Sequence, residues 1–455
     1  MSRECQVSDD PADVFISIFD QVPEDLFLGS KADLLSEDAT VRHAADQIYG
    51  VVVTNGKASP TLTELPTDDT RDAVAMARLN ALDRVLRTVH PNAGAPAPAK
   101  LAGLAARYTR HGHLNTDLGD GLLIPRLMDY SAAKHRADKY ERFSVVRVEP
   151  DRMKNIRFIS LGTRAWPTVT SSDDLLVACL PFLDAPGDVE LDRFADSGGS
   201  WYRLGPSDDD ALERRVDDAI AALDASGAPV ALLPECALSE KLLSIWQRRL
   251  AATYPTSRSR LALVIAGTGP VTNEDPPRNR AVVLDREGCL LWEQDKLCDY
   301  TIEEYTWNRW KLPHASGGEV KEYITRGSEL IVVETTIGRL AILICEDLQR
   351  CDTRRVVPRD LGVSHILVPV FDSPLADDRW HRDAAKNYMD WIGSRVVVSN
   401  SRVVGNLQGN APKMNTAISL SPFRDPKGRY PSQLGTTESA IDIAKVAMPA
   451  LGPLP

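Results

Sequence analysis

The stretch Leu340-Ala341-Ile342-Leu343-Ile344-Cys345-Glu346-Asp347 places a cysteine and two carboxylates directly after five apolar residues. A short, unbroken apolar run of this kind is typical of a strand that is buried on both faces of its sheet. A rigid strand end presents the side chain that follows it at the edge of the sheet, where reactive groups commonly lie. The stretch therefore predicts an α/β domain with Cys345 at a candidate site.

Two other predicted strands end next to residues that suit the same chemistry. Glu235 follows Val230-Ala231-Leu232-Leu233-Pro234, and Lys296 follows a predicted hairpin whose second strand begins at Leu290. A free thiol has a pKa of about 8.5, so a cysteine nucleophile needs a base or a nearby cation at neutral pH. Taken singly, the three residues have plainer interpretations: a buried apolar cysteine, a surface carboxylate and a charge at a hairpin edge.

The chain divides near residues 165–173, where Trp166-Pro167 leads into a polar stretch. Residues 1–168 are expected to form a mainly helical N-terminal domain, since apolar side chains over 70–90 recur at steps of three and four. Residues 174–455 are expected to form a second domain, in which strands alternate with amphipathic helices. This order is typical of an α/β fold whose mixed sheet is covered on both faces.

The expected elements of the two domains follow from the same patterns. In the first domain we also expect a helix near 130–142 and a strand within 143–160. In the second domain a helix is predicted at 208–225. The predicted strands lie at 175–180, 230–233, 261–266, 281–284, 290–292, 330–334, 340–344, 366–370 and 396–399.

Composition limits the classes of protein to which the chain can belong. Its formal net charge of −11 argues against a general nucleic-acid-binding protein, whose phosphate contacts need a basic face. No run approaches the roughly 20 apolar residues that cross a bilayer, and the first residues do not form the apolar core of a signal peptide. Seven cysteines without disulfide spacing favour reduced thiols. We therefore expect a cytoplasmic protein without nucleic-acid or membrane partners.

The motifs around Glu235, Lys296 and Cys345 resemble, in their order and spacing, those of the nitrilase, or carbon–nitrogen hydrolase, superfamily. The resemblance covers roughly residues 174–425 and includes the Leu-Leu-Pro-Glu-Cys run, Asn279-Arg280-Ala281-Val282-Val283 ahead of Lys296, and Ile-Cys-Glu-Asp. Further matches lie at 267–268, 362–369, 384–387 and 396–401. The Ile-Cys-Glu-Asp-Leu form is similar to that of glutamine-hydrolysing amidase domains in the superfamily. The resemblance implies a nitrilase-like α–β–β–α sandwich and a homo-oligomer.

The resemblance also implies a catalytic triad of Glu235, Lys296 and Cys345. Glu235 would take the thiol proton as Cys345 attacks an amide carbon. Lys296 would stabilise the developing negative charge, together with the backbone N–H of Glu346 just past the nucleophile.

A second glutamate is expected a short way after the lysine, often in a Gly-Glu-Tyr context. By this resemblance it would orient Lys296 and the substrate water. Glu303 and Glu304 both follow Lys296 without a preceding glycine, and Glu304 is favoured because Tyr305 comes next.

In the family, the segment after the strand that follows the nucleophile helps to line the pocket. By this resemblance Phe371, Asp372 and Arg379 are candidate substrate-binding residues. An arginine there suits a carboxylate or phosphate on the substrate, and a solvated helix face is the alternative. The insertion at 301–318, which holds two tryptophans, is interpreted as a lid or an oligomer contact.

The predicted function is hydrolysis of a small amide through a thioester on Cys345, with no cofactor and no metal. The other cysteines match no zinc spacing, and a solvated loop is favoured over a metal site for His111 and His113. The nearest alternative is an acyltransferase that passes the acyl group to an amine. A second alternative is a binding or signalling module, in which this domain senses a ligand for the N-terminal part.

Overall fold

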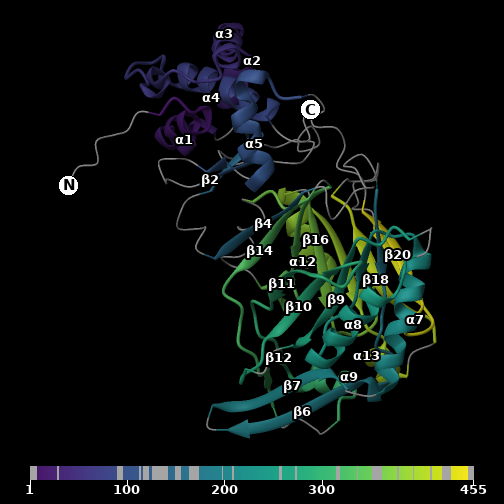
Figure 1. Ribbon diagram of the computed structural model, residues 1–455. Coiled ribbons are helices and arrows are strands. Elements are labelled where there is room, and N and C mark those ends of the chain that lie inside the picture. Colours follow the sequence, from purple (N-terminus) through teal and green to yellow (C-terminus); the bar gives the residue numbers. More distant parts are fainter. Residues whose placement is uncertain are drawn as a thin grey trace.

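The computed structural model shows two large sheets that face each other, with a group of helices at one end of them (Figure 1). The structure describes residues 8–27, 30–89, 96–111, 114–115, 122–125, 142–148, 155–162, 174–196, 198–207, 210–255, 259–271, 274–313, 318–335, 337–350, 361–376, 379–392, 394–409, 412–422 and 432–448.

The first large sheet has six strands in the order β11-β10-β9-β8-β5-β20. Its three central strands, β5, β8 and β9, are parallel, and the outer strands are antiparallel to their neighbours. The strands are β5 (Leu175–Cys179), β8 (Val230–Leu232), β9 (Leu263–Pro270), β10 (Asn279–Asp285), β11 (Leu290–Asp295) and β20 (Ala444–Met448).

The second large sheet has seven strands in the order β19-β18-β17-β16-β15-β14-β4. Strands β15, β16 and β17 are parallel, and β14 and β15 form an antiparallel hairpin. The strands are β4 (Ile156–Gly162), β14 (Leu330–Thr335), β15 (Gly338–Ile342), β16 (His365–Val370), β17 (Arg395–Asn400), β18 (Met414–Leu420) and β19 (Ser432–Thr437).

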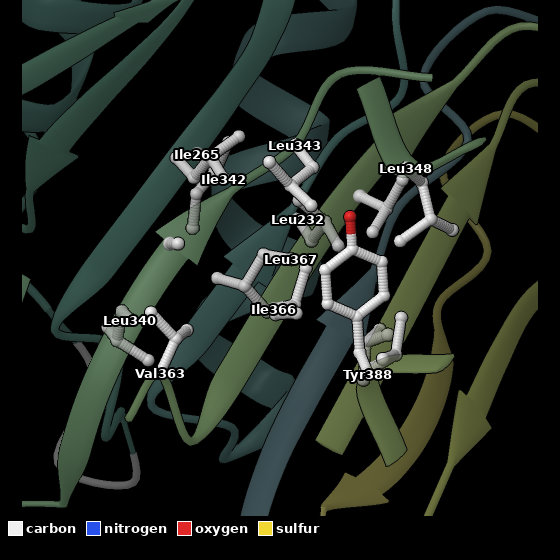
Figure 2. Packing of buried hydrophobic residues seen from close by; sticks show 14 of the residues in the cluster. Leu232, Ile265, Leu340, Ile342, Leu343, Leu348, Val363, Ile366, Leu367 and Tyr388 are labelled. Atoms are coloured by element: carbon white, nitrogen blue, oxygen red, sulfur yellow. The ribbon is translucent and has the colours of Figure 1, made fainter. Parts of the chain in front are cut away.

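Alternate residues along the first sheet face two different cores. Leu232 and Ile265 belong to the core between the sheets, where they pack with Ile342 and Leu367 of the second sheet (Figure 2). Leu233, the neighbour of Leu232, belongs to the core on the outer face. This follows from the pleat of a strand, which sends successive side chains to opposite faces. Both faces of the sheet are therefore buried.

Helices cover the outer faces of both large sheets. α7 (Asp210–Ser226) and α8 (Glu240–Ala252) pack on the first sheet, and α12 (Trp380–Ile392) packs on the second. The apolar stripe of α7 points inward and consists of Leu212, Val216, Ile220 and Leu223. The resulting α–β–β–α order confirms the fold class that the sequence predicts.

A smaller sheet closes the end of the sandwich that lies away from the N-terminal helices (Figure 1). It has four strands in the order β12-β13-β7-β6, and the sequence patterns did not predict it. Its strands are β6 (Val189–Asp196), β7 (Gly199–Pro206), β12 (Thr301–Ile302) and β13 (Val320–Glu322). Three short helices lie near this end: α9 (Glu304–Trp310), α10 (Glu346–Gln349) and α13 (Val403–Gln408).

The N-terminal helices pack around a core of their own. They are α1 (Pro11–Gln21), α2 (Lys31–Glu37), α3 (Ala39–Asn55), α4 (Arg71–Thr88) and α5 (Ala102–His111). A three-stranded sheet of β1 (Leu114–Asn115), β2 (Leu122–Pro125) and β3 (Val145–Val148) joins this core to the sandwich. Leu123 and Val145 belong to the helical core, while Ile124 and Val146 belong to the core of the sandwich.

The structure refines the boundary between the two expected domains. β4 comes before residue 168, yet it pairs with β14, so the second sheet takes one strand from the segment assigned to the N-terminal domain. The division into 1–168 and 174–455 itself stays a prediction. Residues 130–141 of the expected helix, and His113, lie outside the described residues. Among the described helices, none has the length and apolar character to cross a bilayer.

The core between the sheets should contribute strongly to stability. Leu232 is fully buried there, so Leu232→Ala should lower the free energy of unfolding by about 3 kcal/mol. The matched control is Leu290→Ala, at a side chain that is 50% exposed, where the loss should be well under about 1 kcal/mol. Urea unfolding followed by circular dichroism measures both values. Equal losses would contradict the assignment of this core.

Candidate active site

Three strand ends from the two large sheets meet around a small cavity. Glu235 lies three residues after β8, Lys296 directly follows β11, and Cys345 lies three residues after β15. All three side chains line a cavity of about 20 Å³. Its other lining residues are Tyr202, Leu204, Cys236, Tyr300, Ile302, Trp310, Glu322 and Phe371. The structure therefore brings together the three side chains that the sequence places at strand ends.

The ammonium group of Lys296 is held between two carboxylates. Its Nζ lies 2.8 Å from Oε1 of Glu235 and 2.7 Å from Oε2 of Glu322, and only 2% of the lysine side chain is exposed. Nδ2 of Asn279 donates to Oε1 of both glutamates, at 3.0 Å in each case. An ammonium carries three N–H groups, so one remains for a group in the cavity.

Burial and neighbouring charges set the protonation of this cluster. Burial by itself lowers the pKa of Lys296, but the charges of Glu235 and Glu322 outweigh it and raise this pKa well above its usual value. Burial, and then the charge of Glu235, raise the pKa of Cys345 well above its usual value, although Lys296 opposes this. The resting thiol is therefore protonated at neutral pH and needs a base when it attacks.

Cys345 occupies a backbone conformation that L-residues rarely adopt, with φ 48° and ψ −103°. A conformation of this kind costs about 1–3 kcal/mol and is kept only where the surroundings fix it. The N–H of Cys345 donates to the carbonyl oxygen of Pro369 at 2.9 Å, and its own carbonyl accepts from Leu348 at 3.0 Å. No described residue accepts the N–H of Glu346, which leaves that donor free beside the thiol.

Two contacts between the sheets fix how the lysine and the cysteine face each other. The carboxylate of Asp347 accepts the N–H groups of Leu297 and Cys298, at 2.8–3.1 Å. This joins the residues after the lysine to the turn that holds the nucleophile. The N–H of Glu235 donates to the carbonyl oxygen of Val370 at 3.3 Å, which joins the general-base candidate to β16.

The second glutamate beside the lysine is Glu322, and the expectation of Glu304 is wrong. Glu304 is the exposed first residue of α9, whereas Glu322 is 7% exposed and contacts Lys296. The parallel pairing of β13 with β7 carries Glu322 into the site. A Glu-Tyr pair occurs at 304–305 and again at 322–323, so the same sequence signal fits both positions. The first pair is simply nearer to the lysine along the chain.

Of the three expected substrate-binding residues, Phe371 lines the cavity and the other two do not. Its ring meets that of Trp310 edge-on, with centroids 6.1 Å apart. Asp372 and Arg379 instead pair with each other, since Nη2 of the arginine lies 2.8 and 3.0 Å from the two carboxylate oxygens. Arg379 is therefore neutralised by a neighbour and offers no unpaired cation to a substrate.

Several residues of the site had not been predicted from the sequence. Tyr202 and Leu204 reach it from β7, and Asn279 starts β10, where its side chain bridges the two glutamates. Trp310, from the insertion at 301–318, is turned inward and buried. These residues come from segments that are far apart in the chain. The asparagine lies in a motif that the sequence singled out, and Trp310 lies in the insertion interpreted there as a lid or an oligomer contact.

A group of potential metal ligands lies apart from this cavity. Among the described residues, Asp285, Glu287 and Cys289 could together reach one ion. They form the turn between β10 and β11, where Oδ1 of Asp285 accepts the N–H groups of the other two at 2.9 and 2.8 Å. An aspartate that bonds to the backbone ahead of it is common in tight turns, and this explains the grouping.

Comparison with known proteins gives similar structures but no similar sequence. No protein-family model matches the chain, and no curated protein sequence matches it. The chain is similar to Saccharomyces cerevisiae Nit3, a member of branch 10 of the nitrilase superfamily, with 12% identity over 61% of this chain and 92% of that chain and a TM-score of 0.39. An amidase from Nesterenkonia sp. is similar with 16% identity, over 61% and 92% of the two chains, and a TM-score of 0.38. A carbon-nitrogen hydrolase from Helicobacter pylori G27 is 11% identical over 61% and 90%, with a TM-score of 0.36.

The electrostatics of the site predict an unusual response to loss of Glu235. Because the charge of Glu235 raises the pKa of Cys345, Glu235→Gln should move the pH midpoint of Cys345 alkylation downward. Mass spectrometry of the iodoacetamide adduct, followed over time between pH 6 and 10, measures the midpoint. An upward or absent shift would contradict the proximity of the two charges. Exposed Cys289 serves as the internal control, since its midpoint should not move.

Proposed function

We propose that the protein hydrolyses a carbon–nitrogen bond in a small amide, through a thioester formed on Cys345. The proposal rests on one observation: Lys296 contacts both Glu235 and Glu322 and lines the same cavity as Cys345. A thiol, a carboxylate that can act as a base and a buried cation therefore all line the same cavity. The same set would serve acyl transfer to an amine, and the two reactions differ in whether water or an amine attacks the thioester.

In the first step the thiol sulfur of Cys345 bonds to the amide carbon while Glu235 takes its proton. Oε1 of Glu235 already accepts from Lys296 and Asn279, so the proton goes to Oε2. The amide oxygen becomes an oxyanion, which the third N–H of Lys296 and the N–H of Glu346 stabilise. Glu322 keeps the lysine in place during this step and does not itself exchange a proton.

In the second step Glu235 returns its proton to the amide nitrogen, the carbon–nitrogen bond breaks and the amine leaves. Water then attacks the thioester, and Glu235 takes a proton from it as the base of the second half-reaction. The carbon–sulfur bond breaks, the carboxylic acid is released and the thiol is protonated again. The two halves use the same residues in the same positions.

Substrate access requires movement of the cavity wall, since an amide is larger than the space beside Cys345. The wall includes Trp310 at the end of α9 and Phe371 after β16, which contact each other across the cavity. Such closing segments commonly exclude water during the first step and open for release. We infer that α9, which carries Trp310, acts in this way.

Loss of the nucleophile should remove the activity. Cys345→Ala should reduce ammonia release from a panel of small primary amides by roughly 10³-fold or more. Cys289→Ser is the matched control, because that cysteine is exposed in a turn and should leave the rate unchanged. Ammonia is measured by a coupled glutamate dehydrogenase assay, and circular dichroism checks the fold of each variant. Ammonia release that persists in Cys345→Ala would remove Cys345 from the mechanism.

The roles of the two glutamates after the lysine can be compared directly. Glu322→Gln keeps the shape of the side chain but weakens its hold on Lys296, so kcat should fall by about 100-fold while KM changes little. Glu304→Gln, at the exposed position, should leave both constants unchanged. Steady-state kinetics with the best amide of the panel measures them. A larger loss in Glu304→Gln than in Glu322→Gln would reverse the assignment.

A further inference from the structure

Asn279 is bound to the candidate active site through both its backbone and its side chain. It is the first residue of β10, which pairs with β11, and its carbonyl oxygen accepts the backbone N–H of Lys296 at 2.8 Å. Its side-chain amide contacts Glu235 and Glu322, the two carboxylates that hold the ammonium group of the same lysine. One residue therefore contacts the backbone of the lysine and both partners of its side chain.

The side-chain amide of Asn279 acts only as a donor. Its Nδ2 lies 3.0 Å from Oε1 of Glu235 and 3.0 Å from Oε1 of Glu322, so each carboxylate accepts one of its two N–H groups. The opposite orientation would set the amide oxygen against both carboxylates, which excludes it. Oδ1 is buried and accepts no hydrogen bond from the described residues. A buried acceptor without a partner is unfavourable, so the polar contribution of this side chain comes from its two N–H groups.

The two glutamates need these donors because their charges outnumber that of the lysine. Two carboxylates and one ammonium leave one negative charge in excess, and the exposed fractions are only 4% for Glu235, 7% for Glu322 and 2% for Lys296. Burial raises the pKa of Glu322, as does the charge of Glu235, whereas the charge of Lys296 and the hydrogen bonds from Lys296 and Asn279 oppose the rise. The other titratable groups that surround the pair are not cations: they are Tyr202, Cys236, Tyr300, Cys345 and Glu346.

We propose that Asn279 is a positioning residue, whose two N–H groups keep Glu235 and Glu322 ionised together and bound to Lys296. The asparagine also occupies Oε1 of Glu235, which leaves Oε2 of that carboxylate to take the thiol proton. A neutral amide suits this role, because a third carboxylate would add to the excess charge and a hydroxyl group has only one donor. The part of Asn279 in catalysis rests on the proposed hydrolysis, whereas its control of protonation does not require turnover.

The first test measures protonation directly and needs no substrate. Asn279→Leu removes both donors and keeps a side chain of similar size, and Asn279→Ala removes them without adding bulk. In each variant a proton should enter the glutamate pair at a higher pH than in the wild-type protein, because hydrogen bonds to the ionised form lower a carboxyl pKa. Infrared difference spectra recorded along a pH titration follow the carboxylic acid band. This band belongs to the pair if it is absent from N279L/E235Q and N279L/E322Q.

A matched control removes a similar amide elsewhere in the protein. Nδ2 of Asn406 donates to the carbonyl oxygen of Asp184 at 2.7 Å and to its Oδ1 at 2.8 Å, and neither residue lines the cavity around Cys345. Asn406→Leu should therefore leave the titration of the glutamate pair unchanged. An unchanged midpoint in the Asn279 variants would overturn the proposal, and so would an equal upward shift in Asn406→Leu.

The second test is the pH profile of amide hydrolysis. The acid limb of kcat/KM reports the base of the free enzyme, so in Asn279→Leu this limb should move to higher pH. The loss in kcat/KM should be roughly tenfold or more at about pH 6 and should become smaller as the pH rises. A loss of the same size at every pH would overturn the role in catalysis, since general damage to the structure has that effect. Absence of ammonia release from the wild-type protein would contradict the proposed hydrolysis alone, because the infrared titration still decides how Asn279 acts.

Discussion

The buried ammonium group of Lys296 is the constraint on which the arrangement of the site depends. Burying a charged group away from water costs several kcal/mol unless oppositely charged partners compensate the lost hydration. Here the compensation comes from two carboxylates that belong to different sheets, Glu235 after β8 and Glu322 at the end of β13. The large sheet and the small closing sheet are therefore held in one position by the same cation. The lysine in turn keeps one N–H for the place where negative charge develops in the proposed reaction.

The sequence predicts those parts of the site that depend on local structure. Glu235, Lys296 and Cys345 could be found because each follows a short apolar strand, and a strand end fixes where the next side chain lies. The layered α/β fold could be predicted for the same reason, since residues such as Leu232 alternate with neighbours that face the other core. In both cases the sequence signal lies within a few residues of the position that it predicts.

The parts that could not be predicted depend on pairing between distant segments. Glu322 enters the site because β13 pairs with β7, more than a hundred residues earlier in the chain, and nothing near the glutamate indicates that partner. Glu304 has the same local context but starts an exposed helix. Arg379 was an expected cation for the substrate, yet its charge is satisfied by Asp372, seven residues before it. A sequence pattern shows that a charged residue is present and does not show what neutralises it.

The two edges of the β6–β7 hairpin are under different constraints. β7 supplies the backbone that positions β13 and the side chains of Tyr202 and Leu204 in the wall of the cavity. β6 is the last strand of its sheet and pairs only with β7 among the described strands. Substitutions on the outer strand would therefore change an exposed edge of the small sheet, while those on β7 would also change the wall of the cavity beside Lys296. The same hairpin thus has one strand tied to the site by its pairing and side chains and one strand whose outer edge is free of strand pairing among the described residues.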